Sequence, residues 1–282
     1  MFSHLNEPSI LKGLNRYNFG IKLIASFKDY DNIYLVTTFF EGKTLENFKD
    51  KIMNEDEIKF ISACVILSFI YFRKQKIIHR DINFQNIIMD SDNYFNIIDF
   101  SSSINYANKD NKDYYIKTAP YVAPPEMLSK KIYYYNSDYY RLGSLIYYLM
   151  FKKYPNIIKK ENKIKHIKID YKKIRNYSST SIDFLNKLIL TNPKQRIGYE
   201  DINEMKNHFW FNDIDWNNLE KKQIKSPFHF EKNSNNSSKC SEFKLSKKLI
   251  QTYRKTSKTT IFKELIKNFD YANISILQFN YM

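Results

Sequence analysis

The sequence of 282 residues is poor in several features that define whole classes of proteins. Its 2 cysteines cannot build a disulfide framework, which favours a reducing, intracellular compartment. No run approaches the roughly 18 apolar residues that a membrane-spanning helix needs. The first residues lack the charged and apolar regions of a signal peptide. Only 5 glycines occur, and none forms a Gly-x-Gly-x-x-Gly phosphate loop. We therefore expect an intracellular, cytoplasmic protein without a membrane span.

The charge is strongly positive, with 45 Lys and Arg against 30 Asp and Glu and a net charge of +15. A balance of this kind is typical of proteins that bind nucleic acids or membrane surfaces. Here, however, the lysines are scattered along the whole chain among Asn, Ile and Tyr, and no Arg-rich strip or repeat is present. The pattern indicates compositional drift rather than a selected basic surface, so we do not expect a nucleic-acid partner.

The most informative segment carries three oxygen-bearing side chains at fixed spacing. Asp81 precedes Asn86 by 5 residues and Asp99 by 18 residues. Phosphoryl transfer needs a carboxylate to orient the acceptor hydroxyl, together with an amide oxygen and a carboxylate as hard ligands for Mg²⁺ on the nucleotide phosphates. The spacing therefore predicts phosphoryl-transfer chemistry, and the alternative is that these are ordinary turn residues at strand ends.

The hydrophobic pattern predicts mixed secondary structure at the start of the chain and helices later. Asn54, followed by three acidic residues, is a predicted helix N-cap. We expect helices over 5–14 and from Asn54 to about Phe72, and strands over 21–27, 33–40, 87–89 and 95–98. The chain from there to Phe211 has mainly helical patterns. Residues 231–260, rich in Lys, Ser, Asn and Thr, are expected to be flexible.

Several motifs occur in an order that resembles a eukaryotic protein kinase, over residues 5 to about 228. They are His79-Arg80-Asp81-Ile82-Asn83-Phe84-Gln85-Asn86, Asp99-Phe100, Pro124-Pro125-Glu126, Asp138-Tyr139-Tyr140-Arg141-Leu142-Gly143 and Asn192-Pro193-Lys194-Gln195-Arg196. His208-Phe209-Trp210-Phe211 and the residues after it look like the AGC group, the kinases related to the cyclic-nucleotide-dependent enzymes. The resemblance implies ATP and Mg²⁺ as cofactors and a protein as substrate or regulatory partner.

The resemblance also implies an α+β, protein-kinase-like fold with a mainly helical large lobe. Because Glu7 already matches the third helix of the family, the small lobe is expected to be truncated to part of that helix and two strands. The expected divisions are residues 1–42 for this remnant and the hinge, 43–211 for the large lobe, and 212–282 for an AGC-like extension. Within the extension, residues 266–271 resemble the AGC hydrophobic motif, with an ordinary helix end as the alternative.

The resemblance assigns a role to each matching residue. Asp81 would be the catalytic base, Asn86 and Asp99 the metal ligands, and Arg80 the residue that holds the activation segment. Glu7 would pair with the lysine that anchors the nucleotide. Thr118, in the activation segment, belongs to the same catalytic set, and the residue four before it, where AGC kinases are phosphorylated, is a tyrosine.

The nucleotide and structural positions follow in the same way. Thr37 falls at the gatekeeper position, Thr38 and Phe39 at the hinge, and Ile88 under the adenine ring, although core packing explains Thr37 and Ile88 equally well. Glu126 would pair with Arg196, and Asp138 would begin a long helix. The hydrophobic column that links the lobes would consist of Leu11, Leu23, His79 and Phe100.

Four positions depart from the pattern and keep two hypotheses open. Asn83 replaces the lysine of the catalytic loop, which removes a cation from the transferred phosphoryl group. Ser101 replaces the glycine after Asp99-Phe100, and Gln85 and Tyr148 stand where Arg-directed kinases carry glutamates. In the first hypothesis the chain is an AGC-like Ser/Thr kinase, weak or inactive as it stands because the glycine loop and anchoring lysine are missing. In the second it is a pseudokinase that acts as a scaffold or regulator.

Overall fold

The structure is a computed structural model in which two compact units can be described. The first comprises Met1–Ile21 and Phe40–His229, and the second Lys22–Phe39 and Phe230–Met282. The described residues are 7–28, 33–106, 122–130, 133–155, 157–160, 163–166, 176–229 and 269–272. No helix within these ranges is long and apolar enough to cross a membrane.

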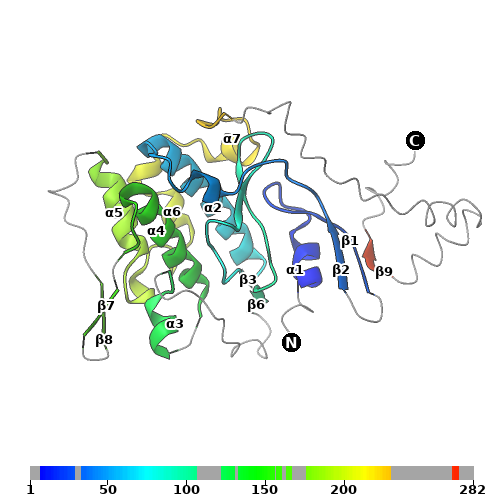
Figure 1. Cartoon of the computed structure of the whole chain (residues 1–282), viewed down its shortest axis with the longest axis horizontal. Helices are drawn as coiled ribbons and strands as arrows, with labels where there is room; N and C mark the ends of the chain where they lie inside the picture. The colour runs from blue at the N-terminus through cyan, green and yellow to red at the C-terminus, as the bar shows by residue number, and fades with distance from the viewer. Residues whose placement is uncertain are drawn as a thin grey trace, which may run out of the picture. The chain divides into compact units, whose positions relative to one another are not determined.

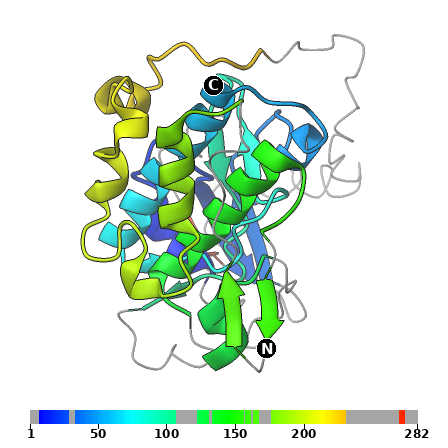
Figure 2. The ribbon, with the colours of Figure 1, turned by 90° about the vertical axis from the view of Figure 1, so that its left-hand side faces the viewer.

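The first unit is mainly helical (Figure 1). Its α-helices are α1 (Glu7–Leu14), α2 (Glu55–Lys74), α3 (Pro125–Lys130), α4 (Tyr135–Phe151), α5 (Ser179–Leu188), α6 (Asn203–Lys206) and α7 (Trp216–Glu220). Short 3₁₀ turns span Leu45–Phe48, Pro193–Gln195 and Phe209–Phe211. The helices of the second half of the chain group together in Figure 2, with a hairpin of β7 (Ile157–Lys160) and β8 (Lys163–His166) projecting from them.

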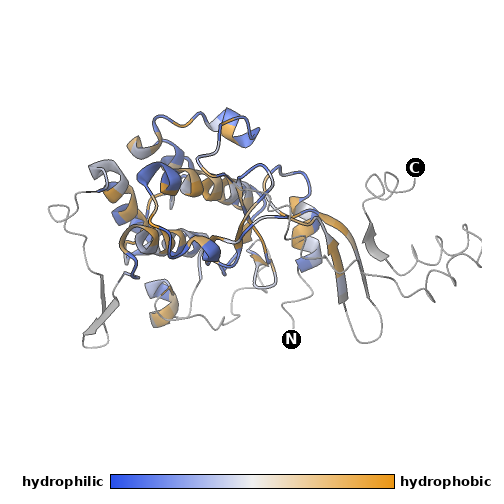
Figure 3. Ribbon diagram, turned by 45° about the horizontal axis from the view of Figure 1, so that its top comes forward, coloured by the Kyte–Doolittle hydropathy of each residue, from blue (hydrophilic) through white to orange (hydrophobic). Residues whose placement is uncertain are grey.

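Helix α2 forms the centre of this unit because its sequence combines a well-capped N-terminus with a long apolar stretch. The Asn54 side chain accepts a hydrogen bond from the Glu57 N–H at 2.9 Å, and Glu57 accepts one from the Asn54 N–H at 3.0 Å. This reciprocal capping box satisfies two N–H groups that the first turn leaves open. Nearly every residue from Ile58 to Phe69 is buried, and much of the interior helical surface is apolar (Figure 3).

Two short antiparallel strand pairs position the predicted site residues of the first unit. Strand β3 (Ile77–Ile78) pairs with β6 (Ile104–Asn105), and β4 (Ile87–Met89) pairs with β5 (Phe95–Ile97). The β4–β5 turn is held by the Asp90 carboxylate, which accepts hydrogen bonds from the N–H groups of Asp92 and Tyr94. Hence the ends of β4 and β5 lie side by side.

The second unit contains a three-stranded antiparallel sheet in the order β2-β1-β9. Strand β1 (Leu23–Lys28) pairs on one side with β2 (Ile33–Thr37) and on the other with β9 (Phe269–Ala272). The sequence predicted β1 and β2 but gave an ordinary helix end as one alternative for the segment that contains β9. That alternative is wrong for the described residues 269–272, because they are extended and pair with the free edge of β1.

The compact units divide the chain differently from the division expected at residue 42. Helix α1 belongs to the first unit. The reason is visible just after it, where the ring of Tyr17 stacks on Tyr71 of α2 with centroids 4.3 Å apart. The Tyr71 hydroxyl also donates to the Gly13 carbonyl at 3.4 Å. These contacts attach α1 and the residues after it to α2.

Candidate active site

The segment between β3 and β4 is the candidate catalytic loop, residues 79–86, and it is anchored on α4. The buried Asp138 carboxylate accepts hydrogen bonds from the backbone N–H groups of His79 and Arg80 at 2.8 and 2.9 Å. It also accepts one from the Tyr133 hydroxyl at 2.9 Å. Burial raises the pKa of Asp138 to about 6, although these donors and the Arg141 charge act in the opposite direction. Two successive loop residues are thus fixed by one side chain.

The backbone on both sides of the site adopts an uncommon conformation. Arg80 has φ +68° and Asp99 has φ +63°, in the left-handed region that non-glycine residues rarely adopt. Such conformations persist only where the surroundings determine them. For Arg80 the surroundings are the Asp138 carboxylate on its N–H and the Ser102 carbonyl, to which its Nε donates at 2.6 Å. The Arg80 side chain is therefore bound to the chain that follows Asp99.

The loop places Asn86 directly on the candidate base. The Asn86 amide nitrogen donates to Asp81 Oδ2 and to the Asp81 carbonyl oxygen, both at 2.9 Å. Asn83 closes the turn between them, because its Oδ1 accepts from the N–H groups of Gln85 and Asn86 at 2.8 and 3.0 Å, and its Nδ2 donates to the Asp81 carbonyl. The side chain that replaces the expected lysine is therefore engaged with the loop backbone.

A residue that sequence reasoning did not assign also reaches the base. Nη1 of Arg141, on α4, lies 3.4 Å from Asp81 Oδ1 and 3.4 Å from the Ile82 carbonyl oxygen. The Arg141 side chain is 1% exposed, whereas that of Asp81 is 33% exposed. A charged residue inside an otherwise buried helix, three positions after Asp138, was the available signal in the sequence. The catalytic loop thus has a buried cation behind it.

The two predicted metal ligands lie at neighbouring strand ends. Ile87 of β4 is paired with Ile97 of β5, and the Ile98 N–H donates to the Asn86 carbonyl at 2.9 Å. Asn86 and Asp99 are therefore one position apart across this ladder. An amide oxygen and a carboxylate are hard donors that suit Mg²⁺, which usually takes one or two carboxylates with phosphate and water oxygens. Among the described residues no cluster of three or more His, Cys, Asp and Glu could hold a metal.

His79 and Phe100 pack together in the interior. Their ring centroids are 4.9 Å apart in an edge-to-face arrangement, and Phe72 of α2 contacts both rings. His79 Nε2 lies 3.1 Å from the Ile98 carbonyl oxygen. Burial lowers the pKa of His79 to about 4, so the ring is neutral near pH 7. Its position indicates packing rather than proton transfer.

Glu126 and Arg196 form a buried ion pair in the first unit. Arg196 donates from Nη1 and Nη2 to the two Glu126 carboxylate oxygens at 2.7 and 2.6 Å. The Ser137 hydroxyl donates to the same carboxylate at 2.6 Å, and Arg196 Nε donates to the Leu190 carbonyl at 2.7 Å. This network joins the start of α3 to α4 and to the segment after α5.

The remaining predicted residues are distributed over both units. Leu11 is buried on α1, Glu7 begins that helix, and Ile88 is half-buried on β4. Thr118 lies outside the described residues. Leu23, Thr37, Thr38 and Phe39 belong to the second unit.

In that second unit, the sheet ends where the hinge was predicted. The Thr38 hydroxyl oxygen accepts from the Lys22 N–H at 3.0 Å, and the Thr38 N–H donates to the Lys22 carbonyl at 2.9 Å. Leu23 is buried and Phe39 is 75% exposed. The adenine contacts and the continuation of the hydrophobic column through Leu23 stay predictions.

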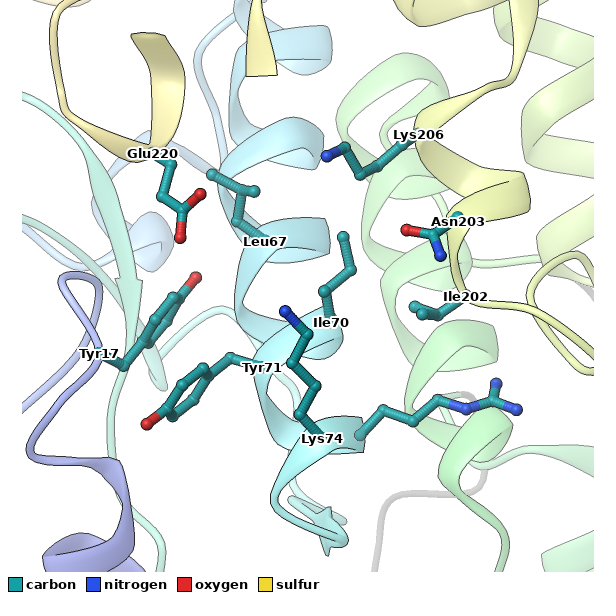
Figure 4. Close-up of a pocket in the computed structure, with 10 residues that line it drawn as sticks. Tyr17, Leu67, Ile70, Tyr71, Lys74, Ile202, Asn203, Lys206 and Glu220 are labelled. Carbon is teal, nitrogen blue, oxygen red and sulfur yellow. The ribbon is translucent and has the colours of Figure 1, made fainter. Parts of the chain in front are cut away.

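A pocket of about 410 Å³ opens elsewhere on the first unit (Figure 4). The stacked rings of Tyr17 and Tyr71 lie on one side of it. Its lining residues are Tyr17, Leu67, Ile70, Tyr71, Arg73, Lys74, Ile202, Asn203, Lys206 and Glu220. None of the predicted catalytic or metal-binding residues lines this pocket, so it has no part in the site described above.

Comparison with known proteins decides the family. The protein kinase domain family matches residues 3–211. The chain belongs to the protein kinase family. Members of this family generally use ATP and Mg²⁺ and act on protein substrates. The match covers both the catalytic loop and the Glu126–Arg196 ion pair.

Individual relatives are Ser/Thr kinases. A probable serine/threonine-protein kinase of Dictyostelium discoideum is 30% identical over 79% of this chain and 50% of its own length. Ribosomal protein S6 kinase alpha-6 of Mus musculus is 27% identical over 79% of this chain and 30% of its own length. cGMP-dependent protein kinase 2 of Rattus norvegicus is 29% identical over 76% of this chain and 29% of its own length. The chain spans half or less of the length of these relatives.

Proposed function

We propose that this chain carries the phosphoryl-transfer centre of an AGC-like Ser/Thr protein kinase, with Asp81 as the base that orients the acceptor hydroxyl. The observation that supports this most is the fixed pair of Asp81 and Asn86, joined at 2.9 Å and held by the Asp138 anchor of the loop. Asp81 is partly exposed, as a group that meets a substrate must be.

Asn86 and Asp99 would hold Mg²⁺, and Arg80 would hold the activation segment through its contact after Asp99. When bound, the metal ion would neutralise charge on the nucleotide phosphates. The amide nitrogen of Asn86 donates to Asp81, so its side-chain oxygen would serve the metal, and Asp99 lies one position away across the β4–β5 ladder. The residues present therefore fit the cofactor on this side of the site.

ATP affinity of these 282 residues alone is expected to be low. The sequence has no Gly-x-Gly-x-x-Gly, and no lysine is assigned to the nucleotide phosphates. Each charge-assisted contact that is missing removes roughly 1.5–3 kcal/mol, and several together weaken affinity by orders of magnitude. Slow transfer is therefore expected from the chain by itself.

The second candidate function is that of a pseudokinase that binds another protein without transferring phosphate. One observation favours it. Asn83 provides no cation, because it is neutral and its amide group is engaged with the loop backbone. Ser101, in place of glycine, adds stiffness where active kinases move.

A titration with Mg²⁺–ATP combined with a transfer assay separates the two candidates. The purified chain should bind a fluorescent ATP analogue more weakly than micromolar, and should label a mixed Ser/Thr protein substrate slowly but above the background of Asp81→Asn. Micromolar binding would overturn the expected weak affinity. Saturation with nucleotide and no labelling above the Asp81→Asn background would favour the pseudokinase.

A further inference from the structure

Arg141 occupies a position on α4 from which it addresses the candidate catalytic loop. It follows Asp138 by three residues, and residues three apart lie on the same face of a helix. From this face Asp138 accepts hydrogen bonds from the N–H groups of His79 and Arg80. Arg141 Nη1 contacts oxygens of the next two residues, Asp81 and Ile82. Four consecutive loop residues are therefore held by two oppositely charged side chains of one helix.

The burial of Arg141 makes its charge effective at the base. Its side chain is 1% exposed and its Nη1 is 3.4 Å from Asp81 Oδ1, so water is kept from the cation, although it still reaches the 33% exposed carboxylate. The loop itself supplies no cation at position 83, because Asn83 is neutral. Arg141 thus brings a positive charge to Asp81 from behind the loop.

The two Asp81 oxygens are held in different ways. Oδ2 receives the Asn86 amide at 2.9 Å, whereas Oδ1 faces Arg141 at the longer distance of 3.4 Å. The Asp81 side chain nevertheless remains 33% exposed. The long contact on the buried side fixes the direction of the carboxylate and leaves it accessible. This suits a catalytic base better than an ion pair that would keep Asp81 away from the substrate.

We propose that Arg141 is a positioning residue for Asp81 that compensates for the missing lysine at position 83. The proposal rests on the phosphoryl-transfer function proposed above. It differs from an inhibitory role, in which the same ion pair would withdraw Asp81 from the substrate and its removal would raise the rate.

The kinetic test uses the full chain with Arg141→Met, Arg141→Lys and Lys187→Met, the last being a control in an exposed ion pair. Arg141→Met should lower kcat about 100-fold with little change in the KM for Mg²⁺–ATP, because the preorganised charge that is lost acts on Asp81 and not on the nucleotide. Arg141→Lys should recover most of the rate, and Lys187→Met should behave as the parent chain. An equal or higher rate in Arg141→Met would overturn the proposal.

Compensation is tested by adding Asn83→Lys. This change should raise the rate of Arg141→Met by a larger factor than it raises the rate of the parent chain, since the two cations serve the same site. Equal factors in both backgrounds would show independent roles and contradict the compensation.

A measurement without catalysis separates this proposal from the proposed function. Urea unfolding of Asp81→Asn, Arg141→Met and the double variant should give a coupling of about tenfold in the unfolding equilibrium constant. A coupling within twofold of unity would overturn the positioning whatever the activity. A tenfold coupling with no transfer by any variant would overturn the proposed function and support the Asp81–Arg141 pairing. Arg141→Gln replaces Arg141→Met if the latter does not unfold cooperatively.

Discussion

The catalytic loop of the first unit and the small sheet of the second differ in how much each is held by buried polar contacts. The loop is fixed by Asp138, Arg141 and Asn86, all buried, through hydrogen bonds and an ion pair. The sheet has three short strands, its β1–β9 pairing shifts register, and Tyr34 and Val36 on β2 are exposed. The residues predicted to carry proton and metal chemistry are therefore held in place by buried polar contacts, while the sheet is held mainly by its backbone ladder.

The largest expected effect is on the buried polar framework of the first unit. Arg196→Ala leaves the Glu126 carboxylate, which is 5% exposed, without its bidentate partner. Removing one partner of a buried ion pair typically costs about 3–5 kcal/mol. Urea unfolding should show a loss of this size. The matched control is Lys187→Ala, which breaks a half-exposed pair with Asp183 and should cost at most about 1 kcal/mol. Equal losses in the two variants would contradict the contrast between framework and surface.

The next effect concerns how the stability of the fold depends on pH through the buried ring of His79. Burial lowers the pKa of His79 from 6.5 to about 4, so its contribution to stability is present above pH 6.5 and is lost as the pH falls through about 4. The full contribution is about 3 kcal/mol. His79→Phe should therefore flatten the fall in unfolding free energy between pH 6.5 and 4. His229→Phe, at an exposed position, should leave that profile unchanged.

Asp138 changes the unfolding free energy with pH in the opposite direction over a similar pH range. Burial raises its pKa from 3.8 to about 6, so its contribution is present below pH 3.8 and is lost as the pH rises through about 6. Asp138→Asn removes this contribution to stability, and acidification should then destabilise the protein more steeply than in the parent chain. A shallower profile in Asp138→Asn would show that another group dominates the titration of this anchor.

A smaller effect is expected in the sheet of the second unit. Tyr271 of β9 pairs with Ser26 of β1. Tyr271→Pro places a residue without a backbone N–H and with a fixed φ in this short strand, and should speed hydrogen exchange of β1 amides about tenfold, or about 1.4 kcal/mol. Tyr271→Thr keeps the donor and the strand preference, and should leave exchange unchanged. Unaltered exchange in the proline variant would mean that β9 does not protect β1.

The smallest effect is expected in substrate preference. Gln85 is neutral, and Tyr148 packs its ring against Phe84 with the Lys49 ammonium 5.4 Å from the Tyr148 centroid. A cation at this place repels basic peptides. A peptide array should show no more than about a threefold preference for Arg before the acceptor. A profile dominated by Arg two or three residues before Ser or Thr would contradict this.

Elements with strong local signals were predictable from the sequence. Asn54 and Glu57 marked the start of α2, and the alternating or continuous apolar runs marked β1, β2, β4 and β5. The fold class followed from motif order and is confirmed by the family match. Local rules could not give the pairing of β9 with β1 or the attachment of α1 to α2, because both depend on contacts between residues far apart in the chain.

The candidate site was predictable to a lesser degree. The spacing of Asp81, Asn86 and Asp99 indicated the chemistry, but the three hydrogen bonds of the Asn83 side chain to the loop backbone and the contact of Arg141 with Asp81 depend on side-chain directions. These directions are set by the left-handed turn at Arg80 and by the packing of α4, which no short motif encodes. The roles of the site residues stay predictions.

The central claim is that the first unit retains a competent phosphoryl-transfer loop. Its most direct test is a chimera in which the first three strands of an AGC kinase precede residue 1, assayed for transfer to protein Ser and Thr, with Asp81→Asn as the inactive control. We predict slow transfer above that control, and a gain of about 10²–10³ on Asn83→Lys. A chimera that folds and binds Mg²⁺–ATP but, with or without Asn83→Lys, does not exceed the Asp81→Asn background would contradict the claim.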